Sequence, residues 1–556
     1  STLNNTEGYL IHAGFGRFGV TASTFEGVKG IIESNGQLNL SASSNAVLDE
    51  AQTTANGITL NSPVISHRQG ILTQLDANQP LSITAETSLD NTLGVIAGNT
   101  DGSLTVGTLL NQWGDIHLEG GNANLNLQTT GKLDNQSGLI SSTKVTLNTQ
   151  SSELDNTDGA IIAAGDAATA SLTINTGVLG NTRGVLQSSG SLTIDTHGQT
   201  LTNTASGADK GILGGVDVIL KTGNLDNHTG YIGSTDNLII EASGNIDNQQ
   251  GGSLLSLAQM VLTGLRLYNQ AGQLQSQQSA TLNLTHEANN TGGLLRSGET
   301  LQITADQLIN NQTQSINRGV EATSIIGFLR NLSNNAGKLY ADALLQLNVI
   351  GSLDNQNGQI TSADQLSIQD SQSSKTLAIT NTQGEIRSTG TLNIDGAELS
   401  GDGTVRSHGD LFLQLAGDYT HNSVLEAEGN LSLLLGGSLV NNSNITSNEC
   451  LAVSTGGDIT NAVSGILMAQ TLDLRAGNLT NRGLVNAGTY ALLQSQTLSN
   501  LGTGRIYADN LSMGANTINN LAESGSAPVI AARNRLDLGA GTITNAEHAL
   551  LFSAGD

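Results

Sequence analysis

The sequence predicts an all-β fold, a right-handed parallel β-helix of about 25 coils of roughly 20 residues each. Three observations support this prediction. The tripeptide Leu-Asp-Asn, or a variant of it, returns about every twenty residues, which is the signature of a solenoid. Apolar and polar residues alternate over short runs bounded by Gly, Asn, Asp and Ser, as they do in strands. The chain has 68 Gly and only 3 Pro, and its apolar residues do not recur at helical spacing.

Residues 353–368 show the elements of one unit in order. The apolar Leu353 is followed by polar turn formers and Gly358, then by the strand-like Gln-Ile-Thr-Ser, a second turn and Leu-Ser-Ile. We therefore expect about three short strands per unit. The side chains predicted to point inward are those of Leu353, Ile360, Leu366 and Ile368, and those predicted to be exposed are Asp354 and Gln359.

Three strands per unit, repeated without reversal, form a coil that stacks on the next coil. Each strand then pairs in parallel with its equivalents, and parallel crossovers are almost always right-handed. Strands lie ~4.8 Å apart along such a stack, so that about 25 coils would form a monomeric rod roughly 120 Å long. One coil cannot bury enough apolar surface alone, and its stability depends on its neighbours.

The recurring Asn has two interpretations. Every unit from Leu89 onward carries Asn at its third position, except those with Gly401 and His421. Stacked amides can hydrogen-bond from coil to coil, and Asn tolerates left-handed turns. Alternatively, the Asn residues form a repetitive ligand-binding surface. The structural interpretation is favoured because the Asn is in phase with the Gly and the core Leu, and from a turn position we expect Asn227→Leu to cost little. The residues expected at equivalent positions are Asn135, Asn156, Asn181, Asn203, Asn227 and Asn248.

The regularity of the pattern varies along the chain. The loose pattern of residues 1–88 predicts an irregular β-helical N-terminal part, and the regular pattern of residues 89–556 predicts the filamentous repeat β-helix. Longer units predict inserted loops, which in solenoids often carry binding function. Because neither end of the chain has a capping sequence, we expect it to be a piece of a longer protein. The predicted insertions are residues 204–215, 312–330, 370–376 and 522–535.

Composition argues against several classes of partner. The formal net charge is −26, which disfavours binding to nucleic acid and to anionic membranes. Cys450 is the only cysteine, so no disulfide can form within the chain, and we expect an outward-facing, unreactive thiol. No apolar run is long enough to span a membrane.

The sequence lacks the motifs of the β-helical enzymes that act on polysaccharides. The triplet Asn-Thr-Asp at residues 99–101 and 156–158 resembles one polygalacturonase motif, but Asp-Asp, Gly-His-Gly and Arg-Ile-Lys are absent. The dinucleotide-like pattern at residues 14–19 precedes a strand-like segment rather than a helix. The nine His have no metal-ligand spacing. We therefore predict that the chain is not an enzyme and has no catalytic, cofactor-binding or metal-binding residues.

The unit apolar-Asp/Thr-Asn-x-x-Gly-x-Ile-x-Ser-x-x-x-Leu-x-Leu resembles the filamentous haemagglutinin repeat of Gram-negative two-partner-secretion exoproteins, and the resemblance covers nearly the whole chain from Leu89 onward. That family includes adhesins and contact-dependent growth inhibition effectors, whose stalks present a receptor-binding region and deliver a toxin.

The resemblance implies a secreted cell-surface stalk, an outer-membrane two-partner-secretion transporter as its export partner, and contact with a target-cell receptor or glycan. It covers the stalk alone, because the Asn-Pro-Asn and Val-Glu-Asn-Asn motifs of other family regions are absent. An adhesin and a toxin carrier are both consistent with it. The alternative is a carbohydrate-binding or carbohydrate-cleaving β-helix of the phage tailspike kind.

Overall fold

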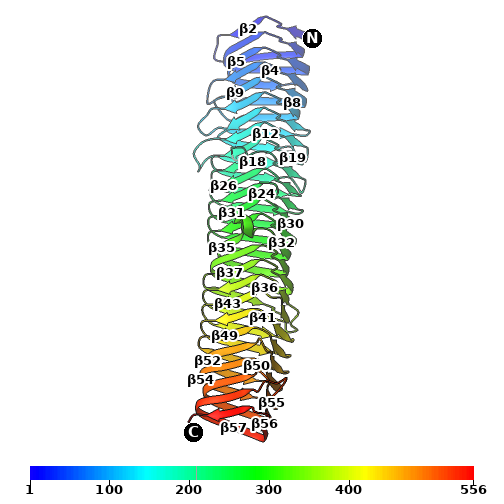
Figure 1. Ribbon diagram of the computed structural model, residues 1–556. Coiled ribbons are helices and arrows are strands. Elements are labelled where there is room, and N and C mark those ends of the chain that lie inside the picture. Colours follow the sequence, from blue (N-terminus) through cyan, green and yellow to red (C-terminus); the bar gives the residue numbers. More distant parts are fainter. Residues whose placement is uncertain (208, 556) are drawn as a thin grey trace. The chain divides into compact units, whose positions relative to one another are not determined.

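The computed structural model describes residues 1–207 and 209–555, which form a parallel β-solenoid of about 26 turns of about 21 residues. The predicted parallel β-helix is therefore confirmed. The chain divides into two compact units, Ser1–Thr285 (unit 1) and His286–Asp556 (unit 2), and each is built from parallel strands that lie side by side (Figure 1). Residues 1–88, expected to be less regular, form strands as long as β4 (Ile31–Val47).

Each coil of unit 1 contributes a strand to three faces. The first face contains β2 (Tyr9–His12), β7 (Ile71–Gln74), β9 (Val95–Gly98), β11 (Asp115–Leu118), β14 (Leu139–Ser142), β17 (Ala160–Ala163), β20 (Val185–Ser188), β23 (Gly211–Gly214), β26 (Tyr231–Ser234), β29 (Ser253–Ser256) and β31 (Gln273–Ser276). The second contains β3 (Arg17–Glu26), β8 (Leu81–Asp90), β10 (Gly102–Leu110), β12 (Asn124–Thr129), β15 (Lys144–Asn148), β18 (Ser171–Asn175), β21 (Ser191–Asp195), β24 (Val218–Thr222), β27 (Leu238–Ala242) and β30 (Met260–Tyr268). The third contains β1 (Thr2–Asn4), β6 (Val64–Ser66), β13 (Leu133–Asp134), β16 (Leu154–Asp155), β19 (Leu179–Gly180), β22 (Leu201–Thr202), β25 (Leu225–Asp226) and β28 (Ile246–Asp247), while β4 and β5 (Gln52–Asn61) run around corners.

Unit 2 repeats this plan. Its first-face strands include β33 (Leu294–Ser297), β37 (Gln359–Ser362), β40 (Glu385–Ser388), β43 (Thr404–Ser407), β46 (Val424–Ala427), β49 (Asn444–Ser447) and β58 (Leu550–Ser553). Its second face includes β34 (Thr300–Ile309), β38 (Gln365–Gln369), β41 (Leu392–Gly396), β44 (Leu411–Leu415), β47 (Leu431–Leu435) and β50 (Cys450–Thr455). Its third face includes β39 (Ala378–Thr380), β42 (Glu398–Ser400), β45 (Tyr419–His421), β48 (Leu439–Asn441), β51 (Ile459–Asn461), β53 (Asn478–Asn481) and β55 (Thr497–Leu501). Longer strands that turn corners are β35 (Gly319–Ser333), β36 (Lys338–Asp354), β52 (Ile466–Arg475), β54 (Leu484–Gln494), β56 (Arg505–Leu521) and β57 (Val529–Ala546).

The core is a set of aliphatic columns produced by in-register pairing. On the first face, Ile140 pairs with Ile161, and Leu186 pairs with Ile212, so that each buried side chain packs on an equivalent one a coil away. Each such side chain contributes roughly 1.5–3 kcal/mol when it is fully buried. Alternation along each strand sends the next residue outward. The repeat therefore encodes the core through period-two alternation and an almost constant coil length.

The burial predicted for the unit at 353–368 is confirmed for its apolar residues. Leu353, Ile360, Leu366 and Ile368 are at most 1% exposed. Asp354 and Gln359, predicted to be exposed, are half-buried instead. The reason is that outward side chains of stacked strands lie against one another: the Asp354 carboxylate accepts a hydrogen bond from Asn335 at 3.1 Å.

The predicted insertions are shorter than the sequence suggested. Residues 319–330 belong to strand β35, which leaves a loop that contains the short 3₁₀ helix η1 (Gln314–Ile316). Strand β57 likewise includes residues 529–535, and β23 includes residues 211–214. Residues 370–376 form a loop as expected. Ala208, inside the first predicted insertion, lies outside the described residues.

Candidate functional site

The Asn residues of successive coils form a buried column inside each unit. In unit 1, every column Asn from Asn91 to Asn248 donates its side-chain N–H to the side-chain oxygen of the next at 2.7–2.8 Å, and all are 0% exposed. The predicted equivalence of these residues and their contact with the next coil are confirmed. The column of unit 1 comprises Asn91, Asn111, Asn135, Asn156, Asn181, Asn203, Asn227, Asn248 and Asn269.

A left-handed conformation does not explain these Asn residues. The residue with positive φ stands two positions later, as at Thr229 with φ 52° after Asn227. The glycine that follows, Gly230, is required for a different reason: a methyl group there would overlap the carbonyl oxygen of Asn203 one coil away. The low cost expected for Asn227→Leu assumed an ordinary turn position, whereas the structure buries this side chain completely. The amide is enclosed because the coils approach closely at this corner.

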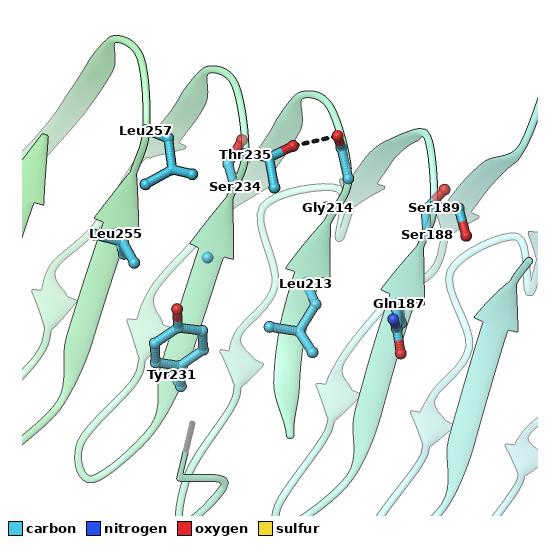
Figure 2. A pocket seen from close by; sticks show the side chains of 12 residues that line it. Gln187, Ser188, Ser189, Leu213, Gly214, Tyr231, Ser234, Thr235, Leu255 and Leu257 are labelled. Atoms are coloured by element: carbon cyan, nitrogen blue, oxygen red, sulfur yellow. Dashed lines mark hydrogen bonds between the residues drawn. The ribbon is translucent and has the colours of Figure 1, made fainter. Parts of the chain in front are cut away.

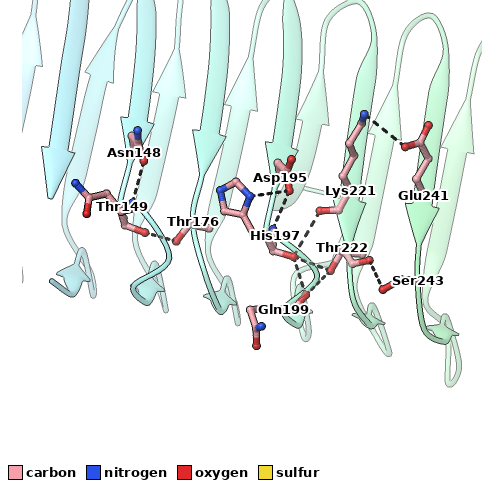
Figure 3. Close-up of polar contacts among 12 residues, drawn as sticks. Asn148, Thr149, Thr176, Asp195, His197, Gln199, Lys221, Thr222, Glu241 and Ser243 are labelled. Carbon is pink, nitrogen blue, oxygen red and sulfur yellow. Dashed lines mark hydrogen bonds and ion pairs between the residues drawn. The ribbon is translucent and has the colours of Figure 1, made fainter. Parts of the chain in front are cut away.

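Hydroxyl side chains form further links between coils, which the sequence prediction did not include. At the end of first-face strands, Ser234 donates to the carbonyl of Val216 at 2.6 Å, and Ser276 donates to that of Ala258 at 2.6 Å. At another corner, Figure 3 shows the hydroxyls of Thr149 and Thr176, which lie 2.8 Å apart. In the sequence, these hydroxyl links are signalled by the Ser that recurs at the end of each Ile-x-Ser segment.

The polar group around Thr222 illustrates why such clusters are structural. The Thr222 hydroxyl donates to backbone carbonyls, among them that of Asn224 at 3.0 Å. The neighbouring pair of Lys221 and Glu241, 3.6 Å apart, has both side chains about half exposed (Figure 3). Exposed pairs of this kind contribute at most about 1 kcal/mol. These hydroxyls are engaged with the backbone, and none is aligned with a base that could activate it.

The Asn column of unit 2 is interrupted at the two exceptions noted in the sequence. It consists of one run from Asn290 to Asn381 and another from Asn441 to Asn545. Between them stand Gly401, which has no side chain, and His421, which is 3% exposed. No hydrogen bonds pair the described strands β42 and β45 there, and a polar hollow of about 660 Å³ opens over them.

His421 is held as a neutral imidazole at this interruption. Its Nε2 lies 3.0 Å from the carbonyl oxygen of Asn444, so Nε2 carries the proton, and its Nδ1 accepts from the Tyr419 hydroxyl at 3.0 Å. Burial lowers the pKa of His421 and raises that of Tyr419. His421 thus replaces the bond that a column Asn makes to the next coil's backbone, but it makes no amide-to-amide bond.

Carboxylates that the repeat places on neighbouring coils are tied by hydrogen bonds and cations. Asp134 and Asp155 occupy paired positions on β13 and β16, and the ammonium of Lys132 lies 3.9 Å and 3.4 Å from them. Burial raises the pKa of Asp155, but hydrogen bonds from Thr157 and Gln136, together with Lys132, lower it on balance. The stack therefore favours the ionised form of Asp155, as a partner in its own structure.

The two Asn-Thr-Asp triplets and the glycine-rich residues 14–19 make only structural or surface contacts. In the triplet at 156–158, Asn156 is a column residue and Asp158 pairs with Arg183 at 2.6 Å on the surface. In the other triplet, the side chain of Asp101 accepts from the backbone of Asn124 at 2.8 Å. The glycine-rich residues 14–19 run into strand β3, not into a helix.

The half-buried Cys450 has a thiol whose pKa is raised by burial and by Asp473. Among the described residues, no group of three or more His, Cys, Asp or Glu is placed to hold a metal ion. No helix in the described part of the chain has the length and apolarity to cross a membrane.

A hollow on the first face of unit 1 is the candidate binding surface. It has a volume of about 290 Å³ and lies over β20, β23, β26 and β29. The Tyr231 ring lies between Leu213 and Leu255, with Gln187 farther along the face (Figure 2). The side chains that line the hollow carry no charge. This is a surface suited to binding rather than to acid–base catalysis.

Comparisons with protein-family models, characterised proteins and solved structures yield no match to this chain. The solenoid of about 26 turns is compatible with a filamentous haemagglutinin-like repeat region. The fold is thus established from the structure, and the comparisons assign no biological role to the chain.

Proposed function

We propose that this chain is a stalk segment of a filamentous haemagglutinin-type exoprotein, secreted through an outer-membrane two-partner-secretion transporter and exposed at the cell surface. There it holds a receptor-binding or toxin module at a distance from the producing cell. The observation that carries the proposal is the repeated inter-coil bonding. Each coil offers the next one a row of strand edges, aliphatic side chains and one amide, as at Asn203, Asn227 and Asn248.

Such a template suits folding during export. A coil that emerges from a transporter can pair at once with the preceding coil, because every contact it needs is one coil away. The single Cys450 means that no disulfide within the chain has to form. A formal charge of −26 limits association between copies of a long repeat. These properties support a proposal in which the chain passes through the transporter unfolded and its coils then stack one after another.

The same features support a non-catalytic role. The carboxylates of Asp134 and Asp155 are engaged by Lys132 and neighbouring amides, and the corner hydroxyls donate to the backbone. Catalysis requires an acid, a base or a nucleophile that converges on one reacting atom. We therefore propose that the segment acts through length and surface, without turnover.

The proposal is tested by removing whole coils from the parent protein. Deletion of residues 399–438 joins Glu398 to Leu439 and removes both column exceptions, which places Asn381 one coil from Asn441. We expect export and folding to persist, while fluorophores on either side of the deletion move closer by ~10 Å. The matched control deletes residues 399–408, about half a coil, and thereby puts the strands that follow out of phase with the equivalent strands of the neighbouring coils.

Surface exposure is measured by external protease on intact cells, and the spacing by energy transfer. The half-coil deletion should abolish export or folding. Equal tolerance of both deletions contradicts templated stacking, and loss of an enzymatic turnover with the two-coil deletion contradicts the stalk function.

A further inference from the structure

The hollow on the first face of unit 1 arises because one outward side chain is missing from a row. In the strand register, Gln187 pairs with Leu213, Leu213 with Gly233, and Gly233 with Leu255. All four positions point outward, since the residues between them are buried. Gly233 therefore leaves a gap one side chain wide between two leucines.

The ring of Tyr231 covers the floor of this gap. A methyl group at Gly233 would lie 2.7 Å from the ring carbon Cε1 and 2.9 Å from the hydroxyl oxygen, so the ring is folded down over the glycine. Figure 2 shows it lying between Leu213 and Leu255 on the outer surface. Partial burial raises the pKa of Tyr231 from an ordinary value that already leaves the hydroxyl protonated at neutral pH. The result is an aromatic surface bounded by aliphatic walls.

Polar groups at the edge of the hollow are free to bind a ligand. Within the described part of the chain, the side chains of Tyr231, Gln187 and Ser189 make no hydrogen bond to protein. By contrast, the Thr235 hydroxyl is already donated to the Gly215 carbonyl. A ligand would thus meet hydroxyl and amide groups, which donate and accept, around an apolar floor.

The absence of charge is a local property of this face. None of the first-face strands from β14 to β31 contains a charged residue. On the same face of unit 2, outward Glu321 instead pairs with Lys338 at 2.7 Å. Charged ligands would gain no partner in the hollow and would lose hydration. A purely aliphatic ligand would leave the polar edge groups unused.

We propose that this hollow binds one neutral hexopyranose unit of a glycan. A pyranose has an apolar C–H face, which fits on the electron-rich face of the Tyr231 ring between Leu213 and Leu255. Its hydroxyl edge then bonds to the Tyr231 hydroxyl, the Gln187 amide and the Ser189 hydroxyl. This goes beyond the stalk function and does not depend on export, because the site is complete within unit 1.

The test titrates the purified chain with lactose, maltose, cellobiose and N,N′-diacetylchitobiose up to 20 mM, with saturation-transfer NMR and calorimetry as readouts. We expect at least one disaccharide to bind with a Kd of about 1 mM, as suits a shallow site with one aromatic contact. Tyr231→Ala should raise that Kd at least about tenfold, and Tyr231→Phe, which removes one hydrogen bond, about three- to tenfold.

Two further variants separate the site from general effects. Gly233→Ala retains the tyrosine but displaces its ring, and it should weaken binding nearly as much as Tyr231→Ala. Tyr340→Ala, at an outward tyrosine of unit 2 whose ring lies 5.7 Å from the Lys338 ammonium, should leave binding unchanged. Circular dichroism should be the same for all variants. Failure of all four sugars to bind, or binding that survives Tyr231→Ala, overturns the proposal.

Discussion

Replacing the column residue Asn227 with Leu should destabilise the stack around it substantially. The Asn227 amide N–H₂ donates to Asn248 at 2.8 Å and to the carbonyls of Gly230 and Ser253 at 3.3 Å. Its oxygen accepts from Asn203 at 2.8 Å. Leucine has the same branching and the same number of side-chain heavy atoms and is somewhat larger, so no cavity forms and the main cost comes from the lost hydrogen bonds.

The magnitude follows from the groups left unpaired. Without the Asn227 amide, one N–H of Asn203 and the side-chain oxygen of Asn248 lose their partners in a site that is 0% exposed. Each unsatisfied buried group costs about 1–3 kcal/mol, which gives about 2–6 kcal/mol in total. Because a long solenoid does not unfold in one step, this cost is expressed as easier local opening.

Hydrogen exchange measured by mass spectrometry reports that opening directly. Amides of the coils between Asn203 and Asn248 should exchange at least about 30-fold faster in Asn227→Leu, since 1.4 kcal/mol is a factor of ten. The matched control is Asn422→Leu, which breaks an amide-to-amide bond of 2.9 Å to Asn442 on the exposed surface. There water replaces the lost partner, and exchange should change less than about threefold. Equal effects of the two variants would refute a stabilising role for the buried column.

Three other perturbations test the stack. Leu225→Asp places an unpaired carboxyl at a position that is 1% exposed, and it should unfold the adjacent coils, seen as loss of their exchange protection. Gly230→Ala should lower the melting temperature by several degrees through overlap with the Asn203 carbonyl, whereas Gly19→Ala, where a methyl group meets nothing within 4 Å, should not. Because burial lowers the pKa of His421 below the ordinary 6.5, the unfolded chain binds a proton more readily. Stability near β45 should therefore be complete above about pH 6.5 and fall by up to about 1.4 kcal/mol per unit below it, until the folded group itself titrates. Local exchange as a function of pH measures this fall, and His421→Asn should abolish it.

The pH dependence is expected at the interruption of the Asn column by Gly401 and His421. Over these two coils the amide column is broken, and β42 and β45 are not paired. A protonated His421 would carry a second N–H toward the Tyr419 hydroxyl, which now donates to it. No titratable group other than Tyr419 hydrogen-bonds to His421 among the described residues. An unchanged exchange rate at pH 5 would show that the hydroxyl simply turns to accept.

The fold could be predicted from the sequence because its determinants are local and repeated. Alternation of apolar and polar residues specifies which side chains of a strand point inward, and the turn formers between strands specify where it bends. Because nearly every coil is about twenty residues long, equivalent residues of neighbouring coils then lie next to each other throughout the chain. For this reason Leu353 and Ile360 were correctly placed in the core from the sequence alone.

What the sequence alone could not decide depends on contacts between residues about twenty positions apart. A polar Leu-Asp-Asn-x-x-Gly segment has the composition of an exposed turn, but the close approach of coils encloses Asn227 completely. The hollow at Tyr231 exists because Gly233 stands between Leu213 and Leu255 in the register, although these residues are distant in the chain. The repeat thus determined the coil and its core by itself, whereas the stacking of coils decided which polar groups are buried and where the surface is hollow.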